Sequence, residues 1–238
     1  MADIGYISLF LALVVSVYSI FAFILGVRGK NPVLISSARN GLLAGTALIS
    51  LSTLILLISF LTHNFEIEYV ARYSSTDTPL AYLISGLWAG NDGSLLFWAW
   101  LLSVIAAVVI LQKRTVGNDL VPYASSIIMA TQAFFLILVL FVSNPFTKLG
   151  FIPVDGLGLN PLLENPGMII HPPALLAGYV GFTVPFAFAI AALLMRRLSD
   201  EWIIAVRRWT LMAWLFLGIG NLIGAWWAYN ELGWGGFW

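Results

Sequence analysis

The chain has 238 residues, of which 61% are apolar and 9% are charged, and its mean hydropathy is +0.95. Because soluble domains carry roughly 25% charged residues, this composition excludes a soluble globular protein and indicates an integral membrane protein. The formal net charge of zero argues against nucleic acid as a partner, and the absence of cysteine excludes disulfides, thiolate metal sites and thiol redox chemistry within the chain.

Six apolar stretches are about long enough to cross a bilayer, which takes about 20 helical residues. Each is expected to be a helix, because a span in lipid must satisfy its own backbone hydrogen bonds. The predicted fold is an all-α polytopic membrane protein, with residues 1–238 forming one membrane domain that carries two outer loops and a truncated tryptophan-rich outer motif. The predicted spans are residues 4–26, 41–61, 94–111, 120–142, 173–195 and 209–229.

Small and special residues within these stretches indicate how the helices pack. Gly41 with Gly45, and Gly220 with Gly224, have the spacing of small residues that lets two helices approach closely. Pro185 is expected to kink the fifth span. Asn221, inside the sixth span, is interpreted as a possible hydrogen bond between helices.

The basic residues predict the orientation of the chain. Nine of the eleven lysines and arginines follow the first, third and fifth spans, whereas the opposite side has only Arg72 and Lys148 and carries eight of the eleven acids. The positive-inside rule therefore places the N-terminus and the exits of the even-numbered spans outside the cytoplasm. The nine basic residues are Arg28, Lys30, Arg39, Lys113, Arg114, Arg196, Arg197, Arg207 and Arg208.

The chemically unusual segments all fall on the predicted outer side. The loop after the second span, about residues 62–93, contains His63 and the stretch "LWAGNDGSLLFW". The loop after the fourth span, about residues 143–172, contains Asn-Pro pairs at 144–145, 160–161 and 165–166, which mark turns and helix starts. Its segment "LNPLLENPGMII" is apolar enough to lie along the membrane surface.

His171 stands directly before Pro172 and Pro173. Since a residue before proline is driven towards extended geometry and proline suits the first turn of a helix, we expect His171 on a stiff, non-helical segment at the outer mouth of the fifth span. An imidazole held there could ligate a metal or accept a proton. A structural or merely solvated histidine is the alternative, and it is the interpretation adopted for His63.

The stretch "AWWAYNELGWGGFW", residues 225–238, is dense in aromatic residues. An interfacial aromatic belt is one interpretation. However, the adjacent pair Trp226 and Trp227 and the glycine-broken segment around Trp234 cannot all face lipid, and the glycines would let a flat ligand approach the backbone. Haem fits best, because its face stacks on indole and its iron takes an axial histidine. A quinone and a carbohydrate fit less well. We therefore expect His171 and these tryptophans to converge on one outer pocket.

Three quoted segments carry a family resemblance. "LNPLLENPGMIIHPPALLAGYVGFTVPFAFA" (159–189), "GAWWAYNELGWGGFW" (224–238) and "LWAGNDGSLLFW" (87–98) resemble the CcmF family, the haem-lyase component of cytochrome c maturation. The second segment is similar to the beginning of the tryptophan-rich motif usually called WWD. In the third, Ala89 and Asp92 depart mildly from the common W-G-G-x-E-G-S-L form. NrfE, CcmC and CcsA are relatives that also handle haem.

The resemblance implies an integral protein of the bacterial inner membrane that presents haem b, as the substrate to be attached, outside the cytoplasm. In such a protein the thiols of an apocytochrome c CxxCH segment add across the haem vinyl groups. His171 matches an axial ligand of the haem iron, and no residue matches a catalytic group. Other cytochrome c maturation membrane proteins are the implied partners. The haem-binding motif is matched by Trp226, Trp227, Trp234, Gly235, Gly236 and Trp238.

The same resemblance implies further parts that residues 1–238 lack. The family motif continues through W-x-x-D-P-x-E-N, followed by a second outer histidine and intramembrane histidines that hold another haem b. We therefore expect these residues to be a fragment, or one half of a split protein, that is inactive without the remainder. The alternatives are a haem delivery component of the CcmC or CcsA type, a purely structural subunit, and a transporter or channel subunit. A transporter usually needs polar groups at mid-membrane, and only Gln132 and Asn221 are available there.

Overall fold

The computed structural model describes residues 1–113, 116–197 and 199–233. Six of its helices are long and apolar enough to cross a membrane, and within the described ranges all regular secondary structure is helical. The predicted all-α membrane fold is thereby confirmed. The long helices are α1 (Ala2–Arg28), α2 (Pro32–Leu61), α5 (Asn91–Leu111), α6 (Val121–Phe141), α7 (Pro166–Leu194) and α8 (Glu201–Leu232); the short ones are α3 (Glu68–Tyr73), α4 (Leu80–Ser85) and the 3-10 turns η1 (Gly86–Trp88) and η2 (Pro161–Leu163).

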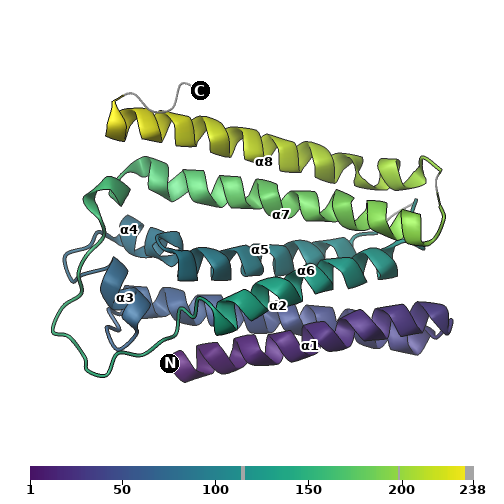
Figure 1. The fold of residues 1–238 in the computed structure, drawn as a ribbon, viewed down its shortest axis with the longest axis horizontal. Coiled ribbons are helices and arrows are strands. Elements are labelled where there is room, and N and C mark those ends of the chain that lie inside the picture. Colours follow the sequence, from purple (N-terminus) through teal and green to yellow (C-terminus); the bar gives the residue numbers. More distant parts are fainter. Residues whose placement is uncertain (114–115, 198, 234–238) are drawn as a thin grey trace.

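The long helices form a bundle in which α1 and α2 pack together on one side, α5 and α6 occupy the middle, and α7 covers them (Figure 1). Helix α8 packs chiefly on α7, at the edge of the bundle. Large apolar side chains such as Leu222 and Trp214 consequently remain exposed on α8. For a membrane protein such a surface faces lipid or further protein.

The two ends of the bundle differ in character. The loop end, at the left of Figure 1, gathers the start of α1, helices α3 and α4, the start of α7 and the last turns of α8. The basic end, at the right, contains the chain reversals after α1, α5 and α7, near which nine of the eleven lysines and arginines fall in the sequence. The predicted separation of the unusual segments from the basic residues is therefore present in the fold.

Several helices begin earlier than the apolar stretches predicted. Helix α2 begins at Pro32 rather than near residue 41, because the Asn31 side chain accepts hydrogen bonds from the amides of Val33 (3.0 Å) and Leu34 (3.1 Å) and caps the helix. Helix α8 begins at Glu201 rather than near residue 209. With 30 and 32 residues at about 1.5 Å each, both helices are longer than the roughly 30 Å hydrocarbon core, so their first turns can lie outside it, where polar side chains carry no penalty.

The predicted start of the fifth span and the predicted conformation of His171 were both wrong. Helix α7 begins at Pro166, not near residue 173, and His171 lies in its second turn. Asn165 caps the helix by accepting a hydrogen bond from the amide of Gly167 at 2.7 Å. The other Asn-Pro pairs were interpreted correctly: Asn160 caps η2, and the Asn144 side chain accepts from the amide of Phe146 in a turn.

The packing glycines behave as their spacing predicted at Gly41 and Gly220, whereas a Cβ atom at Gly45 would lie at an ordinary contact distance, 3.9 Å from the Ser16 hydroxyl oxygen. A Cβ atom added at Gly41 would lie 2.5 Å from the Ser19 hydroxyl oxygen, and one at Gly220 would lie 2.7 Å from the backbone nitrogen of Leu175. Helices α2 and α8 can therefore approach α1 and α7 only because these positions lack side chains. The expected hydrogen bond from Asn221 to another helix is absent from the described part of the chain, since its amide donates to the Leu217 carbonyl of α8 itself at 2.8 Å. The kink at Pro185 stays a prediction.

Candidate functional site

The two long loops at the loop end are joined by their backbones. The amide of Glu68 donates to the Thr147 carbonyl at 2.9 Å, and the amide of Leu149 donates to the Glu66 carbonyl at 2.9 Å. The ammonium group of Lys148 lies 2.6 Å from an Asp3 carboxylate oxygen and 3.5 Å from one of Glu66, and its hydrogen bond to Asp3 raises the pKa of Lys148. These contacts hold the loop of residues 143–165 against α3 and direct it towards α7.

A second junction joins the same loops at Asp155. Its carboxylate accepts hydrogen bonds from both the amide and the hydroxyl of Thr76 at 2.9 Å, and from the amide of Gly156 at 2.7 Å. A Cβ atom at Gly156 would lie 1.9 Å from the Ser74 carbonyl oxygen, so this tight approach requires glycine. The hydrogen bonds from Thr76 lower the pKa of Asp155.

We expect Asp155→Asn to weaken this junction, relative to the native protein, only at pH values at which the native Asp155 carboxylate is ionised. Because the folded-state pKa of Asp155 lies below its ordinary value, the ionised group stabilises the fold above that ordinary value, and the contribution is lost as the pH falls through the folded-state pKa. The protection of the Thr76 amide against hydrogen exchange should therefore be lower in Asp155→Asn than in the native protein at pH 7, and the difference should shrink as the pH falls through the folded-state pKa of Asp155. A difference that stays constant as the native carboxylate is protonated would contradict the assignment.

The stretch "LWAGNDGSLLFW" forms η1 and the start of α5, and the buried Tyr69 fixes its shape. The Tyr69 hydroxyl donates to the Gly86 carbonyl at 3.0 Å and accepts from the amide of Gly90 at 2.9 Å. Burial raises the pKa of Tyr69 far above its usual value, so the hydroxyl keeps its proton. A Cβ atom at Gly93 would lie 2.1 Å from the Leu87 carbonyl oxygen. These contacts hold the turn that carries Trp88 against α3.

Trp88 supports the unusual start of α7. Pro172 has no backbone N–H, so it cannot donate to the carbonyl four residues earlier, which belongs to Met168. The indole nitrogen of Trp88 donates to that carbonyl instead, at 2.9 Å. A side chain 80 residues away along the chain thus supplies the hydrogen bond that the proline removes, and α7 continues through His171 without an orphaned acceptor at Met168.

His171 faces α8, and its ring is tied to the backbone there. Its Nδ1 lies 2.7 Å from the carbonyl oxygen of Gly220. Because a carbonyl can only accept, Nδ1 must carry the proton, and in the neutral ring Nε2 then keeps its lone pair. No described residue donates a hydrogen bond to Nε2. Histidines that bind metals commonly have this arrangement, in which the second ring nitrogen donates to a carbonyl and fixes the orientation of the ring.

The imidazole of His171 packs against Gly224 and Trp227 of α8. A Cβ atom at Gly224 would lie 2.5 Å from Cε1 and 2.6 Å from Nδ1 of His171. One helical turn further on, the Trp227 ring meets the imidazole edge-on, with 5.9 Å between the ring centroids. A Cβ atom at Gly167 would lie 2.7 Å from the Cβ of Trp227. The indole nitrogen of Trp227 is buried and has no hydrogen-bond partner among the residues that the structure describes.

The remaining predicted residues occupy different positions. Trp226 lies beside Trp227 on α8, with 49% of its surface exposed. His63 follows the end of α2 and packs against Phe65, with 5.9 Å between the ring centroids, so it takes no part in the His171 contact. His171 and Trp227 are thus in contact, while the outer haem pocket on which they were expected to converge stays a prediction. The predictions for Trp234, Gly235, Gly236 and Trp238 fall outside the described residues.

Sequence reasoning missed three groups that build this site. They are Trp88, Gly167 and Glu231, none of which was singled out. The Glu231 carboxylate accepts a hydrogen bond from the side chain of Asn165 at 2.6 Å, which fastens the end of α8 to the start of α7. The Asn-Pro helix-start signal at Asn165 identified one partner, whereas no local pattern identified the others.

The donor set limits what this site can bind. Among the described residues, no group of three or more His, Asp or Glu side chains is placed to hold a metal ion. An imidazole with a free Nε2 and an aromatic neighbour could instead supply one axial ligand to a metal that arrives with its own planar ligand. Arg72 and Lys148, the two cations that the sequence places on this side, are already paired with carboxylates, at 2.5 Å from Glu68 and 2.6 Å from Asp3 respectively.

Comparisons with known proteins agree on one family. A family model described as cytochrome C assembly protein matches residues 88–238. The chain is 40% identical over 238 residues to the cytochrome c-type biogenesis protein CcmF of Haemophilus influenzae and 37% identical over 236 residues to that organism's NrfE. The two alignments cover 100% and 99% of this chain, respectively, but only 37% of each relative.

A solved structure gives the same result. The chain superposes on a protein described as cytochrome c heme lyase CcmF with a TM-score of 0.86 and 29% sequence identity, covering 100% of this chain and 38% of that one. The likeness therefore includes the arrangement of all the helices described above, and it spans little more than a third of the larger protein.

Proposed function

Because this chain belongs to the cytochrome c assembly protein family, we propose that it forms part of a haem-presenting unit in cytochrome c maturation. In this proposal the substrate is haem b, held at the loop end so that an apocytochrome c CxxCH segment can reach its vinyl groups. His171 supplies an axial ligand to the haem iron through Nε2. Covalent attachment then belongs to the complete protein, of which these residues contribute the haem-facing part.

The observation that carries the proposal is the hydrogen bond of 2.7 Å between His171 Nδ1 and the Gly220 carbonyl. It assigns the proton to Nδ1 and leaves Nε2 as the available donor. It also fixes the ring against α8, so that little orientational freedom is lost when a ligand binds. A histidine that served only to join α7 and α8 would need this bond, but it would not need an unpartnered Nε2.

The aromatic residues supply the second part of the proposal. Trp227 contacts the imidazole edge-on, and Trp226 offers an exposed indole next to it. Together with Trp234, Gly235, Gly236 and Trp238 they would form the surface on which the porphyrin face stacks. The buried, unpartnered indole nitrogen of Trp227 would donate to a polar group of the substrate, for which a haem propionate is the natural acceptor.

The membrane setting follows from the charge distribution. The basic end would face the cytoplasm and the loop end the outer side of the bacterial inner membrane, where the WWD-type motif would meet apocytochrome c. The remainder of the protein and other cytochrome c maturation proteins would complete the site. The transporter or channel alternative has less support: Asn221 is bonded within its own helix, which leaves Gln132, whose side-chain amide is buried and has no hydrogen-bond partner among the described residues.

Haem retained by the purified full-length protein tests this function. We expect stoichiometric haem b when the protein is expressed without apocytochrome c, with absorbance bands typical of histidine-ligated iron. Protein that carries no haem under these conditions, in a cell that supplies haem, would contradict the proposal.

We predict that Trp88→Phe will loosen the start of α7. The substitution keeps an aromatic ring and removes the N–H that satisfies the Met168 carbonyl; an unsatisfied buried acceptor costs about 1–3 kcal/mol. Amide hydrogen exchange of residues 166–171 should accelerate, and haem retention should fall in parallel.

The matched control for this substitution is Trp100→Phe. It removes an indole hydrogen bond of similar length, 3.1 Å to the Ser50 hydroxyl, between α5 and α2. Exchange at residues 166–171 should stay at the native rate in Trp100→Phe. Equal acceleration in both variants would mean that Trp88 acts on the bundle as a whole and not on the helix that carries His171.

A further inference from the structure

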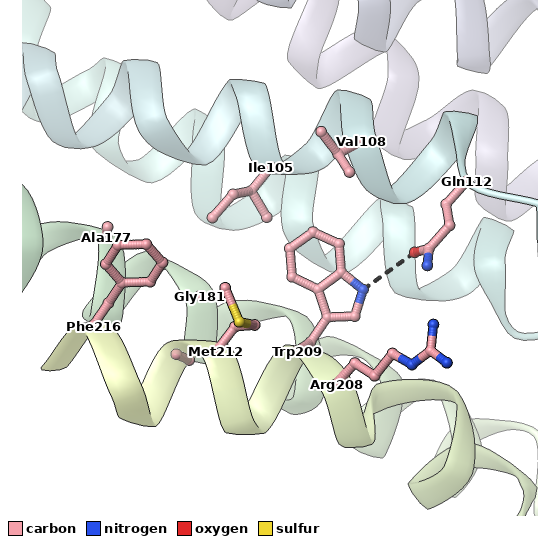
Figure 2. A pocket seen from close by; sticks show the side chains of 10 residues that line it. Ile105, Val108, Gln112, Ala177, Gly181, Arg208, Trp209, Met212 and Phe216 are labelled. Atoms are coloured by element: carbon pink, nitrogen blue, oxygen red, sulfur yellow. Dashed lines mark hydrogen bonds between the residues drawn. The ribbon is translucent and has the colours of Figure 1, made fainter. Parts of the chain in front are cut away.

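A groove at the basic end lies outside the proposed haem site. It has a volume of about 350 Å³, within the range of ligand sites, and α5 and α8 form its walls over a floor of α7 (Figure 2). Ile105 and Val108 of α5 face Met212 and Phe216 of α8 (Figure 2). Nearly all of the lining is therefore apolar.

The polar groups of the groove lie together at one end. Gln112 ends the α5 wall, and its side-chain oxygen accepts a hydrogen bond from the indole nitrogen of Trp209 at 3.2 Å (Figure 2). Arg208 lies on α8 at the same end (Figure 2). Its side chain is exposed and forms no ion pair with any described residue. The groove thus combines an apolar channel with one uncompensated positive charge at its mouth.

The length and depth of the groove match one leaflet of a bilayer. From Arg208 to Phe216 along α8 is about 12 Å at 1.5 Å per residue, close to half of the roughly 30 Å hydrocarbon thickness. Arg208 is seven residues from the start of α8 at Glu201, so its guanidinium can reach the headgroup level while its stem lies along apolar surface. An acyl chain in the groove would therefore place its phosphate beside Arg208.

Two further cavities each contain an arginine, although the lining of the first of them also includes the polar residues Ser36 and Asn118. One contains Arg39 and shares Gln112 with the first groove; the other contains Arg28. Neither has an acidic residue in its lining, and neither arginine forms an ion pair with a described residue. The loop end differs, since Arg72 and Lys148 are both paired there. Arg208, Arg39 and Arg28 thus have no ion-pair partner among the described residues.

From these observations we propose that the groove between α5, α7 and α8 binds an anionic glycerophospholipid of the phosphatidylglycerol class from the leaflet at the basic end. One acyl chain lies between Val108 and Met212, and Arg208 holds the phosphate. Basic pockets between membrane helices recognise anionic headgroups by this combination of charge and apolar depth. The proposal is independent of the haem function.

Native mass spectrometry of the full-length protein tests the lipid site. The protein is released from nanodiscs that contain phosphatidylglycerol or phosphatidylcholine with identical acyl chains. We expect one retained phosphatidylglycerol, no retained phosphatidylcholine, and about fivefold weaker phosphatidylglycerol binding in Arg208→Gln, the factor expected for one cation near the membrane surface.

Two further variants separate a specific site from general surface charge. Arg207→Gln removes the same charge from the adjacent, exposed position on α8, which does not line the groove, and should retain the lipid. Val108→Trp fills the groove from an exposed position on α5 and should displace the lipid while the protein stays monodisperse. Equal binding by Arg207→Gln and Arg208→Gln, equal retention of the two lipids, or cross-linking of position 212 to a membrane helix other than α5 or α7 would overturn the proposal.

Discussion

Replacing His171 by alanine in the full-length protein is expected to lower bound haem by roughly tenfold or more and to stop cytochrome c maturation in the same cells. The substitution removes the only imidazole that the described structure places beside Trp227, since the other histidine of the chain, His63, packs against Phe65 instead. Haem in the purified protein is measured as the pyridine haemochrome, and maturation is measured by haem staining of c-type cytochromes.

His63→Ala is the control, since it makes the same change at the other histidine of the chain. His63 packs against Phe65, so its loss should leave haem near the native amount. The variant His171→Gly with added imidazole distinguishes an iron ligand from a residue that only joins α7 to α8. If His171 is a ligand, the free imidazole should restore haem binding. Native haem content in His171→Ala, or an equal loss in His63→Ala, would refute the assignment of His171.

The membrane helices were predictable because lipid leaves the backbone few alternatives. Helix α1 was expected at residues 4–26 and spans Ala2–Arg28; helix α6 was expected at 120–142 and spans Val121–Phe141. Both have a continuous apolar run and end where the run ends. Hydropathy reports depth in the membrane, however, and not helicity. It therefore missed the start of α2, where polar residues such as Ser36 and Arg39 interrupt the apolar pattern and Asn31 caps the helix well before the long apolar stretch begins.

The conformation of His171 could not be obtained from local rules. The two prolines after it predict an extended residue, and an isolated peptide would follow that preference. In the fold, the indole of Trp88 supplies the donor that Pro172 lacks, and the Asn165 cap starts the helix before the prolines. The hydrogen bond from Trp88 comes from a separate loop, whose conformation depends on the hydrogen bond between the Gly90 amide and the Tyr69 hydroxyl. No window around residue 171 contains that information.

The meeting of His171 with α8 was predictable in part. Topology places the exits of the fourth and sixth spans on the same side, and Gly220 and Gly224 indicate that some neighbour packs closely against α8. The spacing cannot say which side chain fills the space at each glycine. In the structure Gly220 meets the backbone of Leu175, whereas Gly224 meets the imidazole. The pair of glycines thus allows close packing of α8 on α7 and also leaves room for the imidazole of His171.

Gly224→Ala is accordingly expected to disturb the site by adding a single methyl group. The new Cβ atom would lie 2.5 Å from Cε1 and 2.6 Å from Nδ1 of His171, well inside ordinary contact distance, so the ring must move. That movement breaks the 2.7 Å hydrogen bond to the Gly220 carbonyl, which fixes the tautomer and the direction of Nε2. Haem content should fall about tenfold, the usual scale for losing an orienting partner of a metal ligand, with altered absorbance of any haem that remains.

Gly218→Ala supplies the matched comparison on the same helix. A Cβ atom there would meet nothing within 4 Å, while both substitutions favour the helical state by about 1 kcal/mol. Any effect on α8 through helix propensity is therefore common to the two variants, and only Gly224→Ala touches the imidazole. Native haem content and absorbance in Gly224→Ala would show that the imidazole does not bind haem from this position. Equal loss of haem in both variants would mean that haem binding depends on α8 as a whole. Loss of haem in Gly224→Ala alone requires that the imidazole packed against this glycine is the one that holds the iron.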